Sequence, residues 1–81
     1  MNGTLEMFYD LRQSIGTIGD TQVRVRALKK VAALEKAPNK QTAIERIGAL
    51  VRLTDGSAVL DKAVIAFLPG ISKWIRHLSK N

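Results

Sequence analysis

Apolar residues recur at every third or fourth position along most of the chain, and no stretch alternates between apolar and polar residues as a half-buried strand would. A spacing of three and four residues places side chains on one face of a helix. Glycine, proline and an Asp-Gly pair interrupt this pattern at intervals. The pattern therefore predicts helices joined by short loops.

The first helix is predicted over residues 4–15. Its apolar face consists of Met7, Phe8, Leu11 and Ile15. Gly16 and Gly19 end the pattern, and either Asp20 or Thr21 can cap the next helix by accepting a hydrogen bond from a free backbone N–H.

The second helix is predicted over residues 21–37, because Pro38 pushes the residue before it out of the helical region. Its apolar stripe consists of Val23, Ala27, Val31 and Leu34, and Leu28 lies beside it. Basic residues lie largely away from this stripe: Arg26, Lys29, Lys30 and Lys36.

Asn39 is expected to cap a third helix over residues 40–53. The residues predicted to face inward are Ala43, Ile44, Ile47, Leu50 and Val51, and those predicted to face outward are Glu45, Arg46 and Arg52. The Asp55-Gly56 pair predicts a turn after this helix.

Ser57 is expected to cap a fourth helix, whose apolar residues are Leu60, Ala63, Val64, Phe67 and Leu68. Pro69-Gly70 then predicts a kink or a break, because a proline inside a helix removes one backbone hydrogen bond and clashes with the preceding turn. The segment beyond it, residues 71–80, is amphipathic. Its apolar residues are Ile71, Trp74, Ile75 and Leu78, and its polar side carries Lys73, Arg76, His77 and Lys80.

Short loops make consecutive helices pack antiparallel, and 81 residues allow only one core. We therefore predict a single all-α domain over residues 1–81, an antiparallel four-helix bundle with a kinked or split last helix.

Composition adds a net charge of +6 and the absence of cysteine. The positive charge favours anionic partners such as nucleic acid, an anionic membrane face or an acidic protein, although solvated helix faces explain it equally well. The longest apolar stretch, residues 63–68, is far shorter than the roughly 20 residues of a membrane-spanning helix. Because no charged and apolar leader opens the chain, we expect a cytoplasmic protein.

Catalytic and metal-binding patterns are not evident in the sequence. The one histidine, His77, has no further ligands at a matching spacing, and Ser14 and Ser57 have no nearby base. The glycines do not form a phosphate-binding loop. The sequence therefore predicts a binding protein without a cofactor or a metal, rather than an enzyme.

Two segments are candidate contact surfaces. The basic second helix can contact phosphates, although solvated lysines explain it too and few aromatics are available for stacking on bases. The segment 71–80 can lie in a membrane interface or serve as the last packing element, with Trp74 in the core, which we favour. The candidate partner-binding residues are Lys73, Trp74, Arg76, His77, Lys80, Arg26, Lys29 and Lys30.

Four segments follow one another in a particular order: MFYDLRQSI, VRALKKVAALEKA, NKQTAIERIGALVRL and VLDKAVIAFLPGISKWI. In this order they resemble the pediocin-like (class IIa) bacteriocin immunity proteins, which are small, basic, cysteine-free four-helix proteins. The KQTAIE run is the most particular of these motifs. Members of that family usually have a longer C-terminal portion that contributes to recognising the bacteriocin, so the resemblance would place specificity in residues 71–81 and the neighbouring faces here.

The resemblance implies a cytosolic protein that protects the producer cell. Such a protein engages the membrane-embedded complex of the bacteriocin with its receptor, the mannose phosphotransferase permease, and keeps it closed. Basic helices would also favour the anionic inner face of the membrane. A nucleic-acid-binding module is the alternative hypothesis, and an adaptor for an acidic protein is a third.

Overall fold

The computed structural model describes the backbone of residues 3–80 and the side chains of residues 6–80. Within this range the chain forms four helices and no strand, which confirms the all-α prediction. The helices are α1 (Gly3–Gly16), α2 (Thr21–Glu35), α3 (Lys40–Thr54) and α4 (Ala58–Arg76). The α2 helix ends two residues earlier than predicted, and α3 extends one residue further.

Side-chain caps start three of these helices where the sequence predicts them. Of the two candidates before α2, Asp20 is the cap and Thr21 is the first helical residue: one carboxylate oxygen of Asp20 accepts two N–H groups of the first turn at 3.0 and 3.2 Å. Asn39 and Ser57 cap α3 and α4 in the same way, each accepting the backbone N–H three residues ahead. These bonds satisfy N–H groups that a helix start leaves unpaired.

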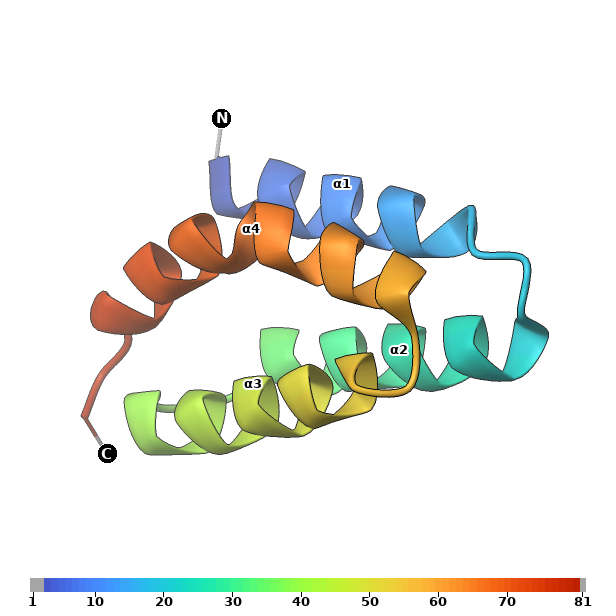
Figure 1. Cartoon of the computed structure of the whole chain (residues 1–81). Helices are drawn as coiled ribbons and strands as arrows, with labels where there is room; N and C mark the ends of the chain where they lie inside the picture. The colour runs from blue at the N-terminus through green and yellow to red at the C-terminus, as the bar shows by residue number, and fades with distance from the viewer. Residues whose placement is uncertain (1–2, 81) are drawn as a thin grey trace.

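The four helices close a ring of contacts, in which each helix packs against its chain neighbours and α1 also packs against α4. In Figure 1, α1 and α4 lie side by side above α2 and α3, and consecutive helices run in opposite directions. All four helices and the first two loops contribute to one core. Its buried apolar residues are Phe8, Leu11, Ile15, Ile18, Ala27, Val31, Leu34, Ala37, Ala43, Leu50, Leu60, Val64 and Ile71.

The inward face of α3 is narrower than the sequence predicts. Ala43 and Leu50 are fully buried, but Ile44 and Val51 are 50% and 41% exposed, so the prediction for these two residues was wrong. Adjacent positions on a helix differ by about 100° in direction, and only one of each pair can point at the middle of the bundle. Of the first pair, Ala43 takes that position, and of the second, Leu50 does.

The α4 helix is continuous through Pro69, so the alternative of a split helix was wrong. Pro69 is exposed, as is Ile65, whose carbonyl loses its usual N–H partner four residues ahead. That carbonyl therefore faces the solvent side of the helix, where water can bind it. Figure 1 shows the axis of α4 bending in its second half, so that its last turns lean toward the start of α3.

Close packing holds α4 against α1 at the bend. A Cβ atom added to Gly70 would lie 2.6 Å from the sulfur of Met7, well inside van der Waals contact. Gly70 therefore allows an approach of the two helices that a larger residue would disturb. Further on, the backbone N–H of Lys40 donates to the carbonyl of Ser79 at 2.6 Å, which ties the end of the chain to the start of α3.

Candidate interaction surfaces

The C-terminal end of α4 carries the first group of candidate residues. Lys73, Arg76, His77 and Lys80 are all exposed. Lys73 and Arg76 lie in the last turn of α4, where positive charge is favoured by the helix dipole, and His77 is the C-cap. We call these four residues the basic end. It combines several cations with a backbone that α4 and the bond to Ser79 hold in place.

Trp74 packs inward from the same segment. Its ring meets that of Phe8 edge to face, with centroids 4.9 Å apart and an angle of 85° between the planes. Aromatic pairs prefer this arrangement because the positive ring edge meets the negative ring face. Trp74 is half-buried against the core, so its main role in this structure is packing.

The second group of candidates lines an open groove between α2 and α3. Its walls are Arg26, Lys29, Lys30, Ala33 and Leu53. A neighbouring depression continues along the same two helices, lined by Lys29, Ala32, Ala33, Lys36 and Arg46. We call the two together the basic groove. Five of its lining residues are cations and none is a carboxylate, which gives the surface a strongly positive potential.

Arg46 was predicted to face outward, and the structure corrects this. The residue is half-buried, and its guanidinium donates to the backbone carbonyl of Ala33 at 2.6 Å. That carbonyl belongs to the last turn of α2, and the N–H of Ala37, four residues ahead, bonds to Leu34 instead. Arg46 thus satisfies an acceptor that the end of a helix leaves free. The sequence did contain a signal for this: Arg46 lies three residues after Ala43, and that spacing places it beside the inward face of α3.

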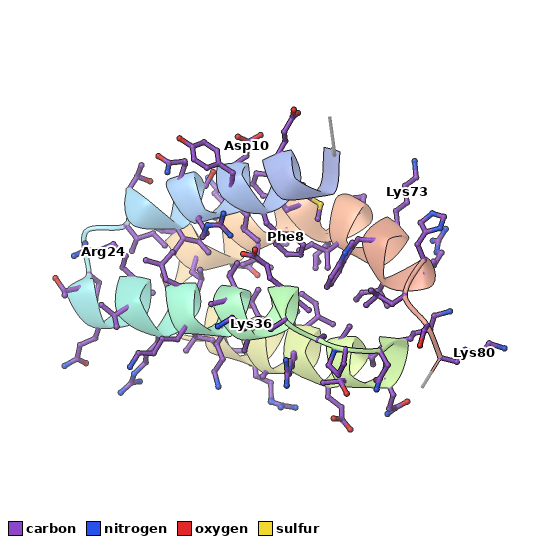
Figure 2. All side chains as sticks on the ribbon, turned by 180° about the vertical axis from the view of Figure 1, so that it is seen from behind. Phe8, Asp10, Arg24, Lys36, Lys73 and Lys80 are labelled. Carbon is purple, nitrogen blue, oxygen red and sulfur yellow. The ribbon has the colours of Figure 1, made fainter. Side chains whose placement is uncertain are left out.

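Acidic residues gather elsewhere. Glu35 is paired with Arg12 in an ion pair between α1 and α2, which removes the carboxylate of α2 from the surroundings of the groove. Glu6 and Asp10 line a separate depression on α1. Figure 2 shows Asp10 on the outer side of α1, away from α2 and Lys36. The basic groove and this depression with two carboxylates therefore lie on different helices.

The basic end and the basic groove are separate surfaces. None of the residues that line the groove comes from the segment 71–80. In Figure 2, Lys73 and Lys80 lie at one end of the molecule and Arg24, near the start of α2, lies at the other. The structure thus divides the eight candidate residues into two groups that a single small ligand would not bridge.

No helix within residues 3–80 combines the length and the apolar character needed to cross a bilayer. Across the same part of the chain, no three histidine or acidic side chains come together in a way that could hold a metal ion.

Comparison of the chain with models of protein families, with curated proteins and with solved structures found no match.

Proposed function

We propose that this chain is a bacteriocin immunity protein, a cytosolic binding protein that protects the cell that makes a pediocin-like bacteriocin. It engages the complex of the toxin with its membrane receptor, the mannose phosphotransferase permease, from the inner side of the membrane. No covalent step is involved, and protection comes from binding alone.

The resemblance of the four segments, in their order along the chain, is the origin of this proposal. The antiparallel four-helix bundle agrees with the fold that the resemblance implies. The observation that best supports the proposal is the basic end, because Lys73, Arg76 and Lys80 are exposed on a segment that Trp74 anchors to the core. An anchored segment loses little conformational entropy on binding, so its contacts contribute more fully to affinity.

The basic end also suits a site at the inner face of the membrane. Anionic lipids there attract lysine and arginine side chains with roughly 1 kcal/mol each near the surface. Three such residues on one end of the molecule would orient it with α4 toward the membrane. This attraction raises the local concentration of the protein near a membrane-embedded receptor.

Expression in a bacteriocin-sensitive strain tests the proposal. The unmodified chain is expected to protect cells against at least one member of a panel of pediocin-like toxins. A variant with Lys73, Arg76 and Lys80 all changed to glutamate is expected to lose that protection, at an equal protein level on immunoblots. Unchanged killing by every toxin in the presence of the unmodified chain would overturn the proposal.

A matched variant distinguishes an effect of the basic end from an effect of the net charge of the protein. Changing Arg26, Lys29 and Lys30 to glutamate alters the net charge by the same amount but leaves the basic end intact. This variant is expected to protect as well as the unmodified chain. If instead it loses protection while the basic-end variant keeps it, the recognition surface is the groove.

The basic groove favours a second candidate function, binding of nucleic acid. Five cations without a carboxylate among them can contact the phosphates of a backbone that follows the groove. Fluorescence anisotropy with labelled duplex DNA and RNA measures this. The affinity is expected to fall with salt, with a logarithmic slope of roughly −0.9 for each phosphate contacted on duplex DNA.

The groove variant is expected to abolish this binding, and the basic-end variant to retain it. No binding to either nucleic acid at low salt would exclude the candidate.

A further inference from the structure

A largely exposed stripe runs along α3 and ends at its C-cap. Its residues follow one another at steps of three and four positions: Gln41, Ile44, Gly48, Val51 and Asp55. Gly48 is half-buried, and the other four are exposed. Ile44 and Val51 are two of the six exposed large apolar residues in the described part of the chain, at 50% and 41% exposed. Steps of three and four, with apolar residues at the inner positions, are the pattern by which one helix packs against another in a coiled coil. We call these five residues the α3 stripe.

Gly48 at the centre of the stripe has no internal reason to be glycine. A Cβ atom added there would meet nothing within 4 Å, whereas one added to Gly70 would clash with Met7. Glycine in the middle of a helix weakens the helix relative to alanine. A glycine on a helix surface does allow the backbone of another helix to come close.

The α3 stripe is complementary to itself when a second α3 lies antiparallel to it. Ile44 precedes Gly48 by four residues and Val51 follows it by three, on the same side of the helix. In an antiparallel pair, Ile44 of one copy and Val51 of the other therefore come within about 1.5 Å of the same level along the helix axis. Two apolar contacts then flank a close approach of the two glycines.

The charges beside the stripe match in the same arrangement. Glu45 precedes Gly48 by three residues and Arg52 follows it by four, so each faces the opposite charge on the second copy. Both side chains are exposed, and the one ion pair among the described residues, between Arg12 and Glu35, involves neither. Opposite charges at equivalent flanking positions of antiparallel helices are a recognised determinant of pairing.

We propose that two copies of this chain associate through the α3 stripe, in a two-fold antiparallel contact centred on Gly48. A two-fold axis makes every contact occur twice, which is what the pairs Ile44 with Val51 and Glu45 with Arg52 require. The basic groove stays open in this dimer, because Arg46 and the groove lie on the other flank of α3, against α2.

The dimer is a weak one. A contact through one helix from each copy buries less than the roughly 1,200–2,000 Å² of a stable interface, and the net charge of +6 on each copy opposes association. At about 0.15 M salt the Debye length is about 8 Å, so repulsion between distant charges is largely screened while the paired charges remain in contact. Association is therefore expected to depend on protein concentration and to be measurable at moderate salt.

Sedimentation equilibrium over a series of concentrations, at this salt, tests the proposal with two charge reversals. Glu45→Arg places arginines opposite one another, and Arg52→Glu does the same with glutamates. Each variant alone is expected to self-associate roughly tenfold more weakly than the unmodified chain. An equimolar mixture of the two variants is expected to recover association, because every facing pair is then of opposite charge.

Two matched variants control for total charge. Asp10→Arg changes the net charge as Glu45→Arg does, and Arg26→Glu changes it as Arg52→Glu does, but both lie on other helices. Neither control alone is expected to show the roughly tenfold loss of self-association that is expected for each α3 variant. A chain that stays monomeric at every concentration would overturn the proposal, and so would a mixture that associates no better than its components.

Gly48→Leu gives a second, independent test. A Cβ atom at this position meets nothing within 4 Å and leucine favours a helix over glycine, so circular dichroism and thermal unfolding are expected to show a folded protein. The same side chain would block the close approach of two α3 helices, and self-association is expected to be lost. A dimer that persists in this variant would exclude a contact centred on Gly48.

Discussion

At the scale of single residues, the contact of Trp74 with Phe8 joins the segment after Pro69 to the first helix. The ring of Trp74 meets a fully enclosed Phe8, so it covers core that would otherwise face water. In a chain of this size the stability margin is small, and one aromatic contact is a large part of it. The same contact determines how firmly the basic end is held.

We therefore expect Trp74→Ala to lower the free energy of unfolding by about 3 kcal/mol, at the lower end of the range for aromatic truncation because the side chain is half-buried. Urea unfolding followed by circular dichroism measures this, since the variant lacks its only tryptophan. Trp74→Phe keeps a ring against Phe8 and should lose only about 1 kcal/mol. Equal stability of all three proteins would contradict the packing role.

At the scale of helices, start and stop residues act locally and independently of the partner helix. Ser57 illustrates this, because its hydroxyl accepts the N–H of Leu60 at 3.2 Å and so begins α4. Ser57→Ala is expected to cost about 1 kcal/mol of stability. Ser72→Ala is the control, since Ser72 is an exposed residue inside α4 and caps nothing. A thermal unfolding midpoint that falls for both variants alike would mean that the cap is not the cause.

The two glycines inside helices respond to different surroundings. Gly48→Ala is expected to raise stability by about 1 kcal/mol, because alanine favours the helix and the added methyl group meets nothing. Gly70→Ala has the same intrinsic gain, but Met7 must move to accept the methyl group, so the net change should be smaller or negative. Chemical unfolding of both variants measures the difference. A larger gain at Gly70 would show that α1 and α4 are less tightly packed than the structure has them.

At the scale of the whole molecule, charge is distributed unevenly. Arg12 and Glu35 neutralise one another between α1 and α2, whereas the cations of the basic groove face no carboxylate within it. The folded state therefore holds like charges close together, which destabilises it at low ionic strength.

Raising the salt from about 0.01 M to about 0.15 M shortens the Debye length from about 30 Å to about 8 Å, and the melting temperature is expected to rise. A gain of about 1 kcal/mol corresponds to roughly 4–8 °C for a domain of this size. Replacing Lys29 and Lys30 by glutamine should reduce the dependence on salt. A melting temperature that falls with salt would mean that attraction between charges outweighs repulsion in the fold.

Most residues of the two candidate surfaces could be predicted from the sequence, but their positions relative to one another could not. The candidate residues Arg26, Lys29 and Lys30 of α2 and the basic residues of the segment 71–80 were identified from their helical spacing, and they are exposed as expected. Their separation into two surfaces depends on how α2 and α4 are placed in the bundle. Arg46 was missed because the carbonyl that it binds belongs to another helix, thirteen residues away in sequence.

The sequence by itself determined the helices, the loops between them and the caps of α3 and α4, because helical spacing and capping act between residues a few positions apart. The tertiary structure decided which of two adjacent apolar residues enters the core, as at Ala43 and Ile44, and on which side of α4 Pro69 lies. Those outcomes depend on the distance and orientation of neighbouring helices, which no local pattern contains. The exposed side of α3 shows this most clearly, because α3 packs against α2 and α4 with Ile44 and Val51 left exposed.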